Sequence, residues 1–228
     1  MNDEQFDNLR SRMMAEIAAE AALTAGHTGI AAFSERVMRV IGNMPRHEFI
    51  PLELQPYAYL NRPLPIGYEK TVSQPFIVAL MTDLLDLQAE DVVLEIGAGA
   101  GYQAAILAEL AQRVYSVDII EELALGADRR LKRLGYENVE IKIMNGYYGW
   151  PEHAPYDKII VTAATDLIPP PLLAQLKPGG RLVIPTGIPE KQALTLVERS
   201  PTGSIAAREI LPVRFSELED PGETAGVA

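Results

Sequence analysis

A short apolar run that ends in three alternating glycines constrains the fold of this chain more than any other feature. The segment reads Val93-Leu-Glu-Ile-Gly-Ala-Gly-Ala-Gly-Tyr102 and combines a buried strand, a glycine turn and the start of a helix. Because glycine has no side chain, the backbone of such a turn can approach a bound nucleoside closely at the carboxyl edge of a parallel sheet. The segment therefore predicts an α/β fold with a nucleoside site at the end of one core strand.

The spacing of these glycines distinguishes between two classes of cofactor. Gly97, Gly99 and Gly101 follow a Gly-x-Gly-x-Gly pattern, whereas the dinucleotide pattern Gly-x-Gly-x-x-Gly needs a glycine where Tyr102 stands. Glu95 lies inside the apolar strand, where an ionised carboxylate is costly unless a cation compensates it. S-adenosylmethionine is cationic, while the pyrophosphate of a nicotinamide dinucleotide is anionic. A nicotinamide-dependent enzyme is therefore the least favoured alternative, although Glu95 could also be an exposed residue at the strand end.

A second acidic residue stands where a nucleoside site needs one. Asp118 ends the expected second strand, 17 residues beyond Gly101. A carboxylate at that place can accept hydrogen bonds from both ribose hydroxyls of a nucleoside. The alternative role is an N-cap for the helix that starts near Glu121. The neighbouring glycine turn favours ribose binding.

Strands and helices alternate with short connections after residue 88. The expected strands are 92–97, 113–118, 139–144, 156–163 and 181–185, and the expected helices are 102–110, 121–134 and 169–177. Two more strands, 193–198 and 207–215, follow with only a turn between them. This order predicts a doubly wound, mostly parallel sheet that closes with an antiparallel C-terminal hairpin.

Two helices are expected before this core. The first covers residues 3–25, where apolar side chains recur at helical spacing, and Gly26 and Gly29 should end it. Ser34 is a suitable N-cap for the second helix, which should end between residues 42 and 45.

Six prolines between residues 45 and 75 rule out a long helix there and predict an ordered, irregular loop system. We therefore divide the chain into N-terminal helices and loops at 1–72, a nucleoside-binding α/β core at 73–217 and a flexible tail at 218–228. A single core with an N-terminal extension is also what 228 residues favour.

Composition excludes several functions. A formal charge of −11 argues against a protein that grips phosphate backbones, so no nucleic-acid partner is expected. The chain has no cysteine, which excludes disulfides and thiolate chemistry, and its three histidines show no metal-ligand spacing. No signal-like start or membrane-length apolar run is present. We therefore expect a cytoplasmic protein without a metal and without a membrane partner.

Five segments together resemble one known family. They are Arg46-His-Glu-Phe-Ile-Pro51, Pro63-Leu-Pro-Ile-Gly-Tyr-Glu-Lys-Thr-Val-Ser-Gln-Pro75, Glu95-Ile-Gly-Ala-Gly-Ala-Gly-Tyr-Gln103, Tyr156-Asp-Lys-Ile-Ile-Val-Thr-Ala-Ala164 and Leu173-Ala-Gln-Leu-Lys-Pro-Gly-Gly-Arg-Leu-Val-Ile-Pro185. Over about residues 35–215 the chain resembles the protein-L-isoaspartate O-methyltransferases. The segment between Pro63 and Pro75 is the most specific to that family.

The resemblance implies a seven-stranded, Rossmann-like methyltransferase fold, with S-adenosylmethionine as methyl donor and S-adenosylhomocysteine as product. It also implies a repair activity on isoaspartyl peptides and proteins. The free α-carboxylate that appears when aspartyl or asparaginyl residues isomerise is methylated, and the ester then closes spontaneously to a succinimide. A carboxylate is already ionised near neutral pH, so this methyl transfer needs no general base.

Particular residues acquire roles through the same resemblance. Ser73 matches the family's active-site serine, which orients the substrate carboxylate or the donor. The positions implied in donor binding are Thr71, Val72, Glu95, Gly97, Ala98, Gly99, Ala100, Gly101, Asp118, Ile119, Asn145 and Gly146. From the residues alone, Ser73 could instead cap the helix that starts at Pro75, and Asn145-Gly146 could be a simple turn.

The chain also departs from the family's pattern. Asn145 stands where the family usually has an aspartate beside the adenine, so an amide acceptor remains but its charge is lost. Glu69-Lys70 and residues 215–218 differ on the substrate side. Two other functions stay open: a methyltransferase for another carboxylate or a small molecule, and a non-catalytic protein that binds the nucleoside. Whether the protein is a monomer or a dimer is open as well.

Overall fold

The computed structural model describes residues 3–219. The N-terminal part contains helices α1 (Asp3–Thr28) and α2 (Glu35–Asn43), short 3-10 helices η1 (Arg46–Phe49) and η2 (Leu52–Tyr57), and the hairpin strands β1 (Leu64–Gly67) and β2 (Lys70–Val72). The core continues with α3 (Pro75–Leu85), β3 (Val92–Ile96), α4 (Tyr102–Ala108), β4 (Arg113–Asp118), α5 (Glu121–Arg133), β5 (Val139–Ile143), η3 (Gly146–Tyr148), η4 (Pro151–His153), β6 (Tyr156–Val161), α6 (Pro170–Gln175), β7 (Leu176–Ile188), β8 (Lys191–Arg199) and β9 (Ile205–Val213).

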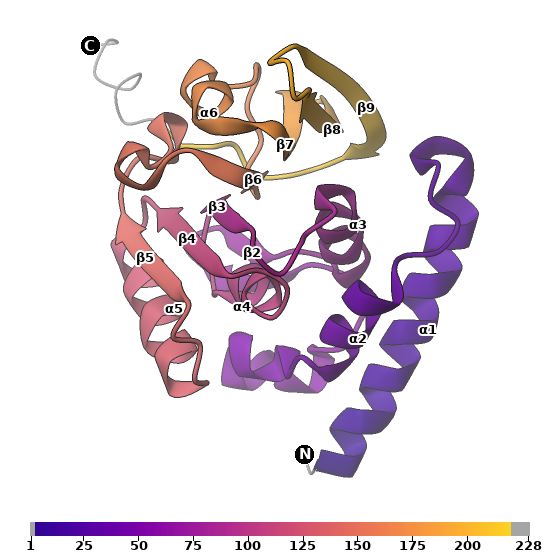
Figure 1. The fold of residues 1–228 in the computed structure, drawn as a ribbon. Helices are drawn as coiled ribbons and strands as arrows, with labels where there is room; N and C mark the ends of the chain where they lie inside the picture. The colour runs from indigo at the N-terminus through magenta and orange to yellow at the C-terminus, as the bar shows by residue number, and fades with distance from the viewer. Residues whose placement is uncertain (1–2, 220–228) are drawn as a thin grey trace.

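A seven-stranded sheet in the order β5-β4-β3-β6-β7-β8-β9 forms the centre of the molecule (Figure 1). Neighbouring strands from β5 to β7 are parallel, and β7, β8 and β9 are antiparallel. The predicted doubly wound sheet with an antiparallel C-terminal hairpin is therefore confirmed. From β3 the chain continues to β4 on one side, and from β6 it continues to β7 on the other. The boundary between β3 and β6 is thus a topological switch point, where such sheets bind ligands.

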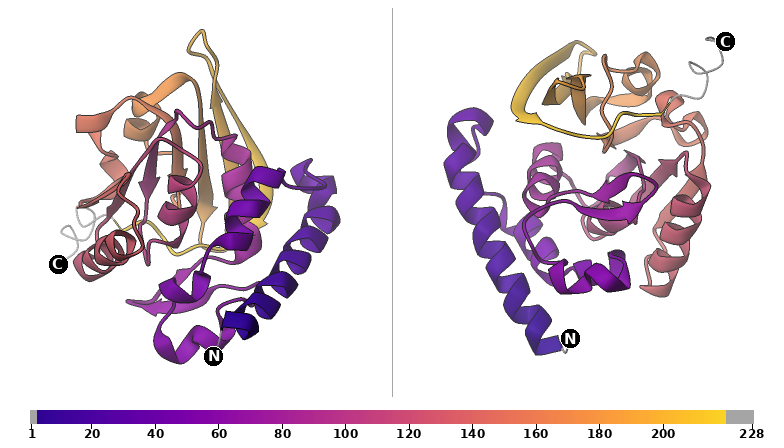
Figure 2. Two further views of the ribbon diagram at one scale, coloured as in Figure 1. Left: turned by 60° about the horizontal axis from the view of Figure 1, so that its bottom comes forward. Right: turned by 180° about the vertical axis from the view of Figure 1, so that it is seen from behind.

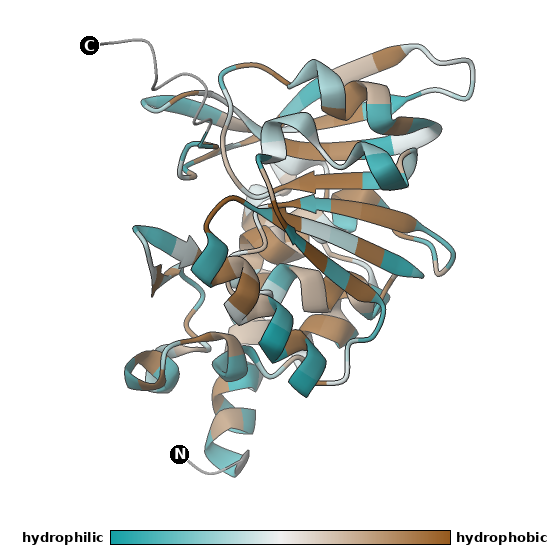
Figure 3. Cartoon of the chain, turned by 90° about the vertical axis from the view of Figure 1, so that its left-hand side faces the viewer, coloured by the Kyte–Doolittle hydropathy of each residue, from teal (hydrophilic) through white to brown (hydrophobic). Residues whose placement is uncertain are grey.

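Alternate residues of the central strands face two different cores. In β6, Ile160 packs into the core formed with α1 to α4, while Ile159 and Val161 pack on the opposite face with Trp150 and Leu172. Figure 3 shows the central strands largely in brown, the colour of hydrophobic residues. One face carries the longer helices, and the other is covered by α6 and the short segments η3 and η4. Right-handed crossovers require this segregation, because the chain winds in opposite directions from β3 and from β6.

The N-terminal helices pack mainly on the helix layer, and α1 also contacts the edge strand of the sheet. α1 packs against α2, α3 and β9, and the two views of Figure 2 show it along one side of the molecule. The predicted cap is confirmed, because the Ser34 side chain accepts a hydrogen bond from the Val37 backbone nitrogen. Gly26, however, does not break α1, which runs on to Thr28. Gly29, with φ of 74°, follows the end of the helix.

The proline-rich segment is more regular than expected. It contains η1, η2 and the hairpin of β1 and β2, in which Leu64 pairs with Val72. Tyr68 and Glu69 form the hairpin turn, and both have positive φ angles. The sequence did not predict this hairpin, because neither residue belongs to the types that favour a left-handed turn.

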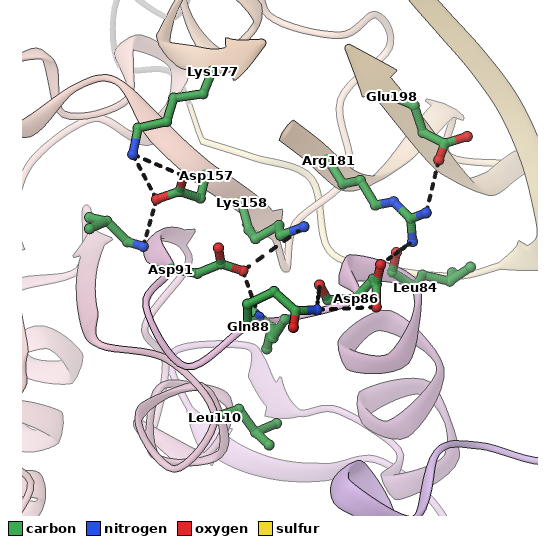
Figure 4. A network of polar contacts seen from close by, with 12 residues as sticks. Leu84, Asp86, Gln88, Asp91, Leu110, Asp157, Lys158, Lys177, Arg181 and Glu198 are labelled. Atoms are coloured by element: carbon green, nitrogen blue, oxygen red, sulfur yellow. Dashed lines mark hydrogen bonds and ion pairs between the residues drawn. The ribbon is translucent and has the colours of Figure 1, made fainter. Parts of the chain in front are cut away.

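Charged side chains link neighbouring strands at the amino ends of the parallel strands, on the side of the sheet opposite the switch point (Figure 4). Asp157, near the start of β6, accepts hydrogen bonds from the Val92 backbone nitrogen at 2.9 Å and from Lys177 Nζ at 2.8 Å. Arg181 of β7 pairs with Glu198 of β8, with 3.2 Å between Nη2 and Oε1. These contacts join β3, β6, β7 and β8 near the amino ends of the parallel strands, so we assign them to stability rather than to chemistry.

The chain after β9 returns to the sheet. The Ala164 backbone nitrogen donates to the carbonyl oxygen of Ser216 at 2.8 Å, and the Leu218 nitrogen donates to the carbonyl oxygen of Ala164 at 2.7 Å. Glu219 pairs with Lys70 of β2 at 2.6 Å. Residues 218–219, which the sequence predicts as the start of a flexible tail, are therefore part of the ordered fold. The rest of that predicted tail, residues 220–228, lies outside the described residues.

Candidate active site

A cavity of about 970 Å³ opens at the carboxyl ends of the parallel strands, at the switch point. Its walls come from β2, from the start of α3, from the ends of β3, β4 and β6, and from the C-terminal segment 211–219. Ten of the predicted site residues line it: Thr71, Val72, Ser73, Gly97, Ala98, Gly99, Ala100, Asp118, Ile119 and Gly146. The other three, Glu95, Gly101 and Asn145, are not among its lining residues.

The glycine turn after β3 is held by a residue of the neighbouring strand. Thr162, directly after β6, donates from its hydroxyl to the carbonyl oxygen of Gly97 at 2.8 Å and from its backbone nitrogen to that of Ile96 at 2.9 Å. A Cβ atom on Gly97 would lie 2.3 Å from the Thr162 hydroxyl, and φ at Gly97 is 95°. Only glycine fits there without strain. Thr162 belongs to a segment that carries the resemblance, but it is not among the predicted site residues.

Asp118 closes the turn from the side of β4. Its Oδ2 accepts a hydrogen bond from the Gly99 backbone nitrogen at 2.8 Å, and its Oδ1 accepts one from the Ile120 nitrogen at 2.9 Å. The side chain does not cap α5, because Ile120 is the N-cap residue and no side chain bonds the first turn. Burial raises the pKa of Asp118, and the two backbone donors oppose that rise. The carboxylate therefore faces the cavity with both oxygens already oriented.

Glu95 is fully buried, so the alternative of an exposed strand-end residue is wrong. Ser116 of β4 donates its hydroxyl to Oε2, and Oε1 has no hydrogen-bond partner. Burial raises the pKa of Glu95 to about 8, with the nearby Asp118 charge adding to the rise and the Ser116 hydroxyl opposing it. The carboxyl group is thus a poor place for a negative charge unless a cation approaches the adjacent wall.

Ser73 lies between β2 and α3 and lines the cavity. It does not cap α3: the N-cap residue is Gln74, and no side chain of the cap makes the capping bond. The capping interpretation is therefore wrong, and the hydroxyl is left to the cavity. The carbonyl oxygen of Ser73 accepts a hydrogen bond of 2.8 Å from Arg46 Nη2.

Arg46 is a buried cation whose importance the sequence did not indicate. Its side chain is 0% exposed, and Nε donates to the carbonyl oxygen of Ala58 at 2.8 Å. Its guanidinium lies over the ring of Tyr102, 4.7 Å from the centroid. Burial lowers the pKa of Arg46, and Tyr102 opposes that effect. Arg46 therefore connects the Ser73 segment with the residue that follows the glycine turn.

The Asn145-Gly146 pair forms a turn, as its alternative interpretation predicted. The Asn145 side chain accepts a hydrogen bond from the Tyr147 backbone nitrogen at 2.9 Å and so caps η3. Gly146 lines the cavity, and a Cβ atom there would lie 2.3 Å from the Ile96 side chain. The family-based contact between Asn145 and adenine stays a prediction.

Two parts of the cavity wall go beyond the predicted site residues. One is the segment 211–219, of which the resemblance places only residues 215–218 on the substrate side. The other is Glu20 of α1, whose carboxylate reaches Asn61 and Gln74. Glu20 has no local sequence signal, because its place depends on contacts between segments far apart in the chain.

The histidines and acids form no other candidate centre in residues 3–219. His47 stacks on Phe6 and His153 on Tyr115, each with 3.9 Å between ring centroids, so both imidazole rings pack against aromatic side chains. Within that range no three histidine or acidic side chains are grouped to hold a metal ion. None of its helices is both long and apolar enough to span a bilayer.

Comparison with known proteins shows the family to which this chain is similar. Residues 23–222 match the family described as protein-L-isoaspartate(D-aspartate) O-methyltransferase. Protein-L-isoaspartate O-methyltransferase 1 of Polaromonas sp. strain JS666 is 60% identical, covering 96% of this chain and 93% of the relative. The protein of the same name from Cupriavidus necator is 56% identical over 95% of this chain and 84% of its own.

Solved structures with a similar fold carry the same family name. A protein-L-isoaspartate O-methyltransferase matches with a TM-score of 0.77 and 30% identity, over 92% of this chain and 66% of that one. A putative protein-L-isoaspartate O-methyltransferase from Plasmodium falciparum, solved with S-adenosyl-L-homocysteine, shares the fold with a TM-score of 0.72 at 22% identity, over 82% and 91% of the two chains. The chain described here belongs to the protein-L-isoaspartate O-methyltransferase family.

Proposed function

We propose that the protein transfers the methyl group of S-adenosylmethionine to the free α-carboxylate of L-isoaspartyl residues in damaged proteins. Family membership over residues 23–222 supports the reaction. The observation that carries it in the structure is that Ser73, Gly99 and Asp118 line one cavity. We further propose a cytoplasmic location and a peptide partner rather than nucleic acid or membrane, in keeping with the charge of −11.

The residues present fit the donor. Asp118 offers carboxylate oxygens to the ribose hydroxyls, and the Gly97–Gly101 turn leaves room for a nucleoside close to its backbone. Thr71, Val72, Ile119 and Gly146 would complete the pocket around it. Glu95 directly precedes Ile96, which lines the cavity. Its buried carboxylate would compensate the positive charge of the donor through space. When bound, S-adenosylmethionine supplies an electrophilic methyl group.

The chemistry left to this chain is alignment and shielding. The attacking substrate carboxylate is ionised near neutral pH and needs no base. The Ser73 hydroxyl, free of any capping bond to α3, can donate a hydrogen bond that orients this carboxylate. Strand β2 and the segment 211–219 both line the cavity and are joined by the ion pair between Lys70 and Glu219, so together they would shield the site from water.

The assignment is tested by labelled methyl transfer from S-adenosylmethionine to an isoaspartyl peptide and to its aspartyl twin. We expect label on the isoaspartyl peptide only. Equal label on both peptides, or on neither, removes the repair function. Label on another protein carboxylate or on a small molecule would favour a different acceptor, and donor binding without any transfer would favour a non-catalytic binding protein.

A serine substitution tests the catalytic assignment. Ser73→Ala should lower kcat on the isoaspartyl peptide at least tenfold while the Kd for S-adenosylhomocysteine changes less than threefold, which are order-of-magnitude expectations for one lost orienting hydrogen bond (about 1.4 kcal/mol per factor of ten). Ser11→Ala on the exposed face of α1 is the matched control. Unchanged turnover in Ser73→Ala would remove Ser73 from the mechanism.

A further inference from the structure

The N-terminal helix α1 contributes one carboxylate to the wall of the cavity. Glu20 lines it, although the part of the chain that matches the family begins only at residue 23. The position is fixed by packing, because Met13, Ile17 and Ala21 on the same helix are buried in the main core. The Glu20 side chain is therefore presented to the cavity by a docked helix and not by a loop.

The carboxylate holds two side chains at once. Glu20 Oε2 accepts hydrogen bonds from Asn61 Nδ2 at 2.7 Å and from Gln74 Nε2 at 3.0 Å. Gln74 directly follows Ser73. Charge-assisted hydrogen bonds of this kind are stronger than those between neutral groups, so Glu20 restrains the side chain beside the proposed active-site serine.

Glu20 also orients the group that caps α3. Asn61 Oδ1 accepts a hydrogen bond of 2.9 Å from the Phe76 backbone nitrogen in the first turn of α3, while its amide nitrogen donates to Glu20. Since the carboxylate can only accept, it determines which end of the Asn61 amide faces α3. The Gln74 side chain does not cap α3, and Asn61 supplies the capping acceptor instead. Glu20 of α1 orients the Asn61 amide for this role.

Ser73 is consequently held from two sides. Arg46 fixes its carbonyl oxygen, and Glu20 fixes the next residue and the helix start that follows. We propose that Glu20 is a positioning residue for methyl transfer, acting through Gln74 and Asn61 on the placement of Ser73. This inference rests on the proposed function and assigns α1 to the active site.

The test compares turnover, donor affinity and stability in variants of the full chain. Glu20→Ala should lower kcat on an isoaspartyl peptide about tenfold, because a displacement of catalytic groups of about 1 Å can cost up to a hundredfold. The Kd for S-adenosylhomocysteine should stay within about twofold of the wild-type value, because Glu20 does not act on the donor. Glu20→Gln retains one oxygen that can accept both hydrogen bonds and should restore turnover to within about threefold of wild type.

Two control variants distinguish an effect of Glu20 on the placement of Ser73 from a general weakening of the packing of α1. Glu16→Ala removes an exposed carboxylate one turn earlier and should leave kcat unchanged. Ile17→Val loosens the buried face of α1 and should lower Tm without a matching loss of kcat. Equal losses of kcat in Ile17→Val and Glu20→Ala at equal losses of Tm would overturn the proposal.

The remaining outcomes are also decisive. Wild-type turnover in Glu20→Ala would overturn the positioning role while leaving the methyltransferase function intact. A loss of donor affinity equal to the loss of turnover would place Glu20 at the donor site instead and would likewise overturn it. If the wild-type chain itself showed no methyl transfer, the proposed function would be excluded. If the wild type and Glu20→Ala were equally active, only the positioning role of Glu20 would be excluded.

Discussion

Arg46 Nη2 lies 2.8 Å from the carbonyl oxygen of Ser73, at the end of a guanidinium that is fully buried. The same guanidinium reaches the carbonyl oxygen of Ala58 through Nε at 2.8 Å. One side chain therefore satisfies two buried acceptors that belong to different loops. Only the planar, branched arginine head group has this reach.

Arg46→Lys should destabilise the protein and slow it. A single ammonium group cannot reach both carbonyl oxygens, so at least one is left without a donor, at a cost of about 2 kcal/mol in the free energy of unfolding. The Ser73 segment would shift, and kcat should fall with it. Denaturant unfolding and peptide turnover measure the two effects, with Arg39→Lys on the exposed face of α2 as control. Wild-type stability and turnover in Arg46→Lys would contradict the structure.

Asp118→Ala should weaken binding of S-adenosylhomocysteine by about ten- to a hundredfold. The change removes the acceptor proposed for the ribose hydroxyls and frees the Gly99 backbone nitrogen, and hydrogen bonds to charged groups contribute about 1.5 to 3 kcal/mol each. Calorimetric titration measures the Kd directly. Asp128→Ala, which removes the partner of Lys132 on α5, is the matched control and should bind normally. Undiminished affinity in Asp118→Ala would exclude the carboxylate from the donor site.

Gly97→Ala and Gly126→Ala should shift stability in opposite directions. At Gly97 the new Cβ would collide with the Thr162 hydroxyl at a φ of 95°, so we expect a loss of about 2 kcal/mol or more. At Gly126, inside α5, nothing lies within 4 Å of a new Cβ, and alanine should add about 0.4 to 1 kcal/mol. Thermal or denaturant unfolding distinguishes the pair. A stable, donor-binding Gly97→Ala variant would show that the turn can relax.

Glu95→Gln should flatten the pH dependence of stability in the unliganded protein. Burial raises the pKa of Glu95 to about 8 in the folded state, against 4.5 without burial. The folded state therefore holds a proton that the unfolded chain has released, so this stabilisation is complete below about pH 4.5 and is lost as the pH rises towards 8, by up to about 1.4 kcal/mol per pH unit. The amide has no proton to lose.

The difference between wild type and Glu95→Gln isolates this residue from other titrating groups. Denaturant unfolding at pH 5.5 and at pH 7.5 should show the variant gaining stability relative to wild type as the pH rises. Parallel pH profiles of the two proteins would mean that Glu95 is ionised throughout this range. Its Ser116 hydrogen bond would then outweigh the cost of burial.

Much of the core was predictable because its signals are local. The sequence predicts the strand at 113–118 residue for residue and the helix from Glu121 to within one residue of its end. Side-chain alternation and helical spacing are properties of neighbouring residues, so no tertiary information is needed to detect them. The Gly97–Gly101 turn and Asp118 were likewise readable, since close backbone approach requires glycine and ribose hydroxyls require an acceptor at a strand end.

The sequence by itself thus determined the α/β class, the nucleoside site and, through its motifs, the family. Only the tertiary structure decided what holds Ser73 in place. It showed that Ser73 does not cap α3, that Arg46 reaches its carbonyl oxygen, and that Glu20 orients Asn61 to supply the cap. The physical reason is distance along the chain. A glycine's freedom is encoded at its own position, whereas the partner of a buried donor or acceptor depends on which remote segments the folded core brings within 3 Å.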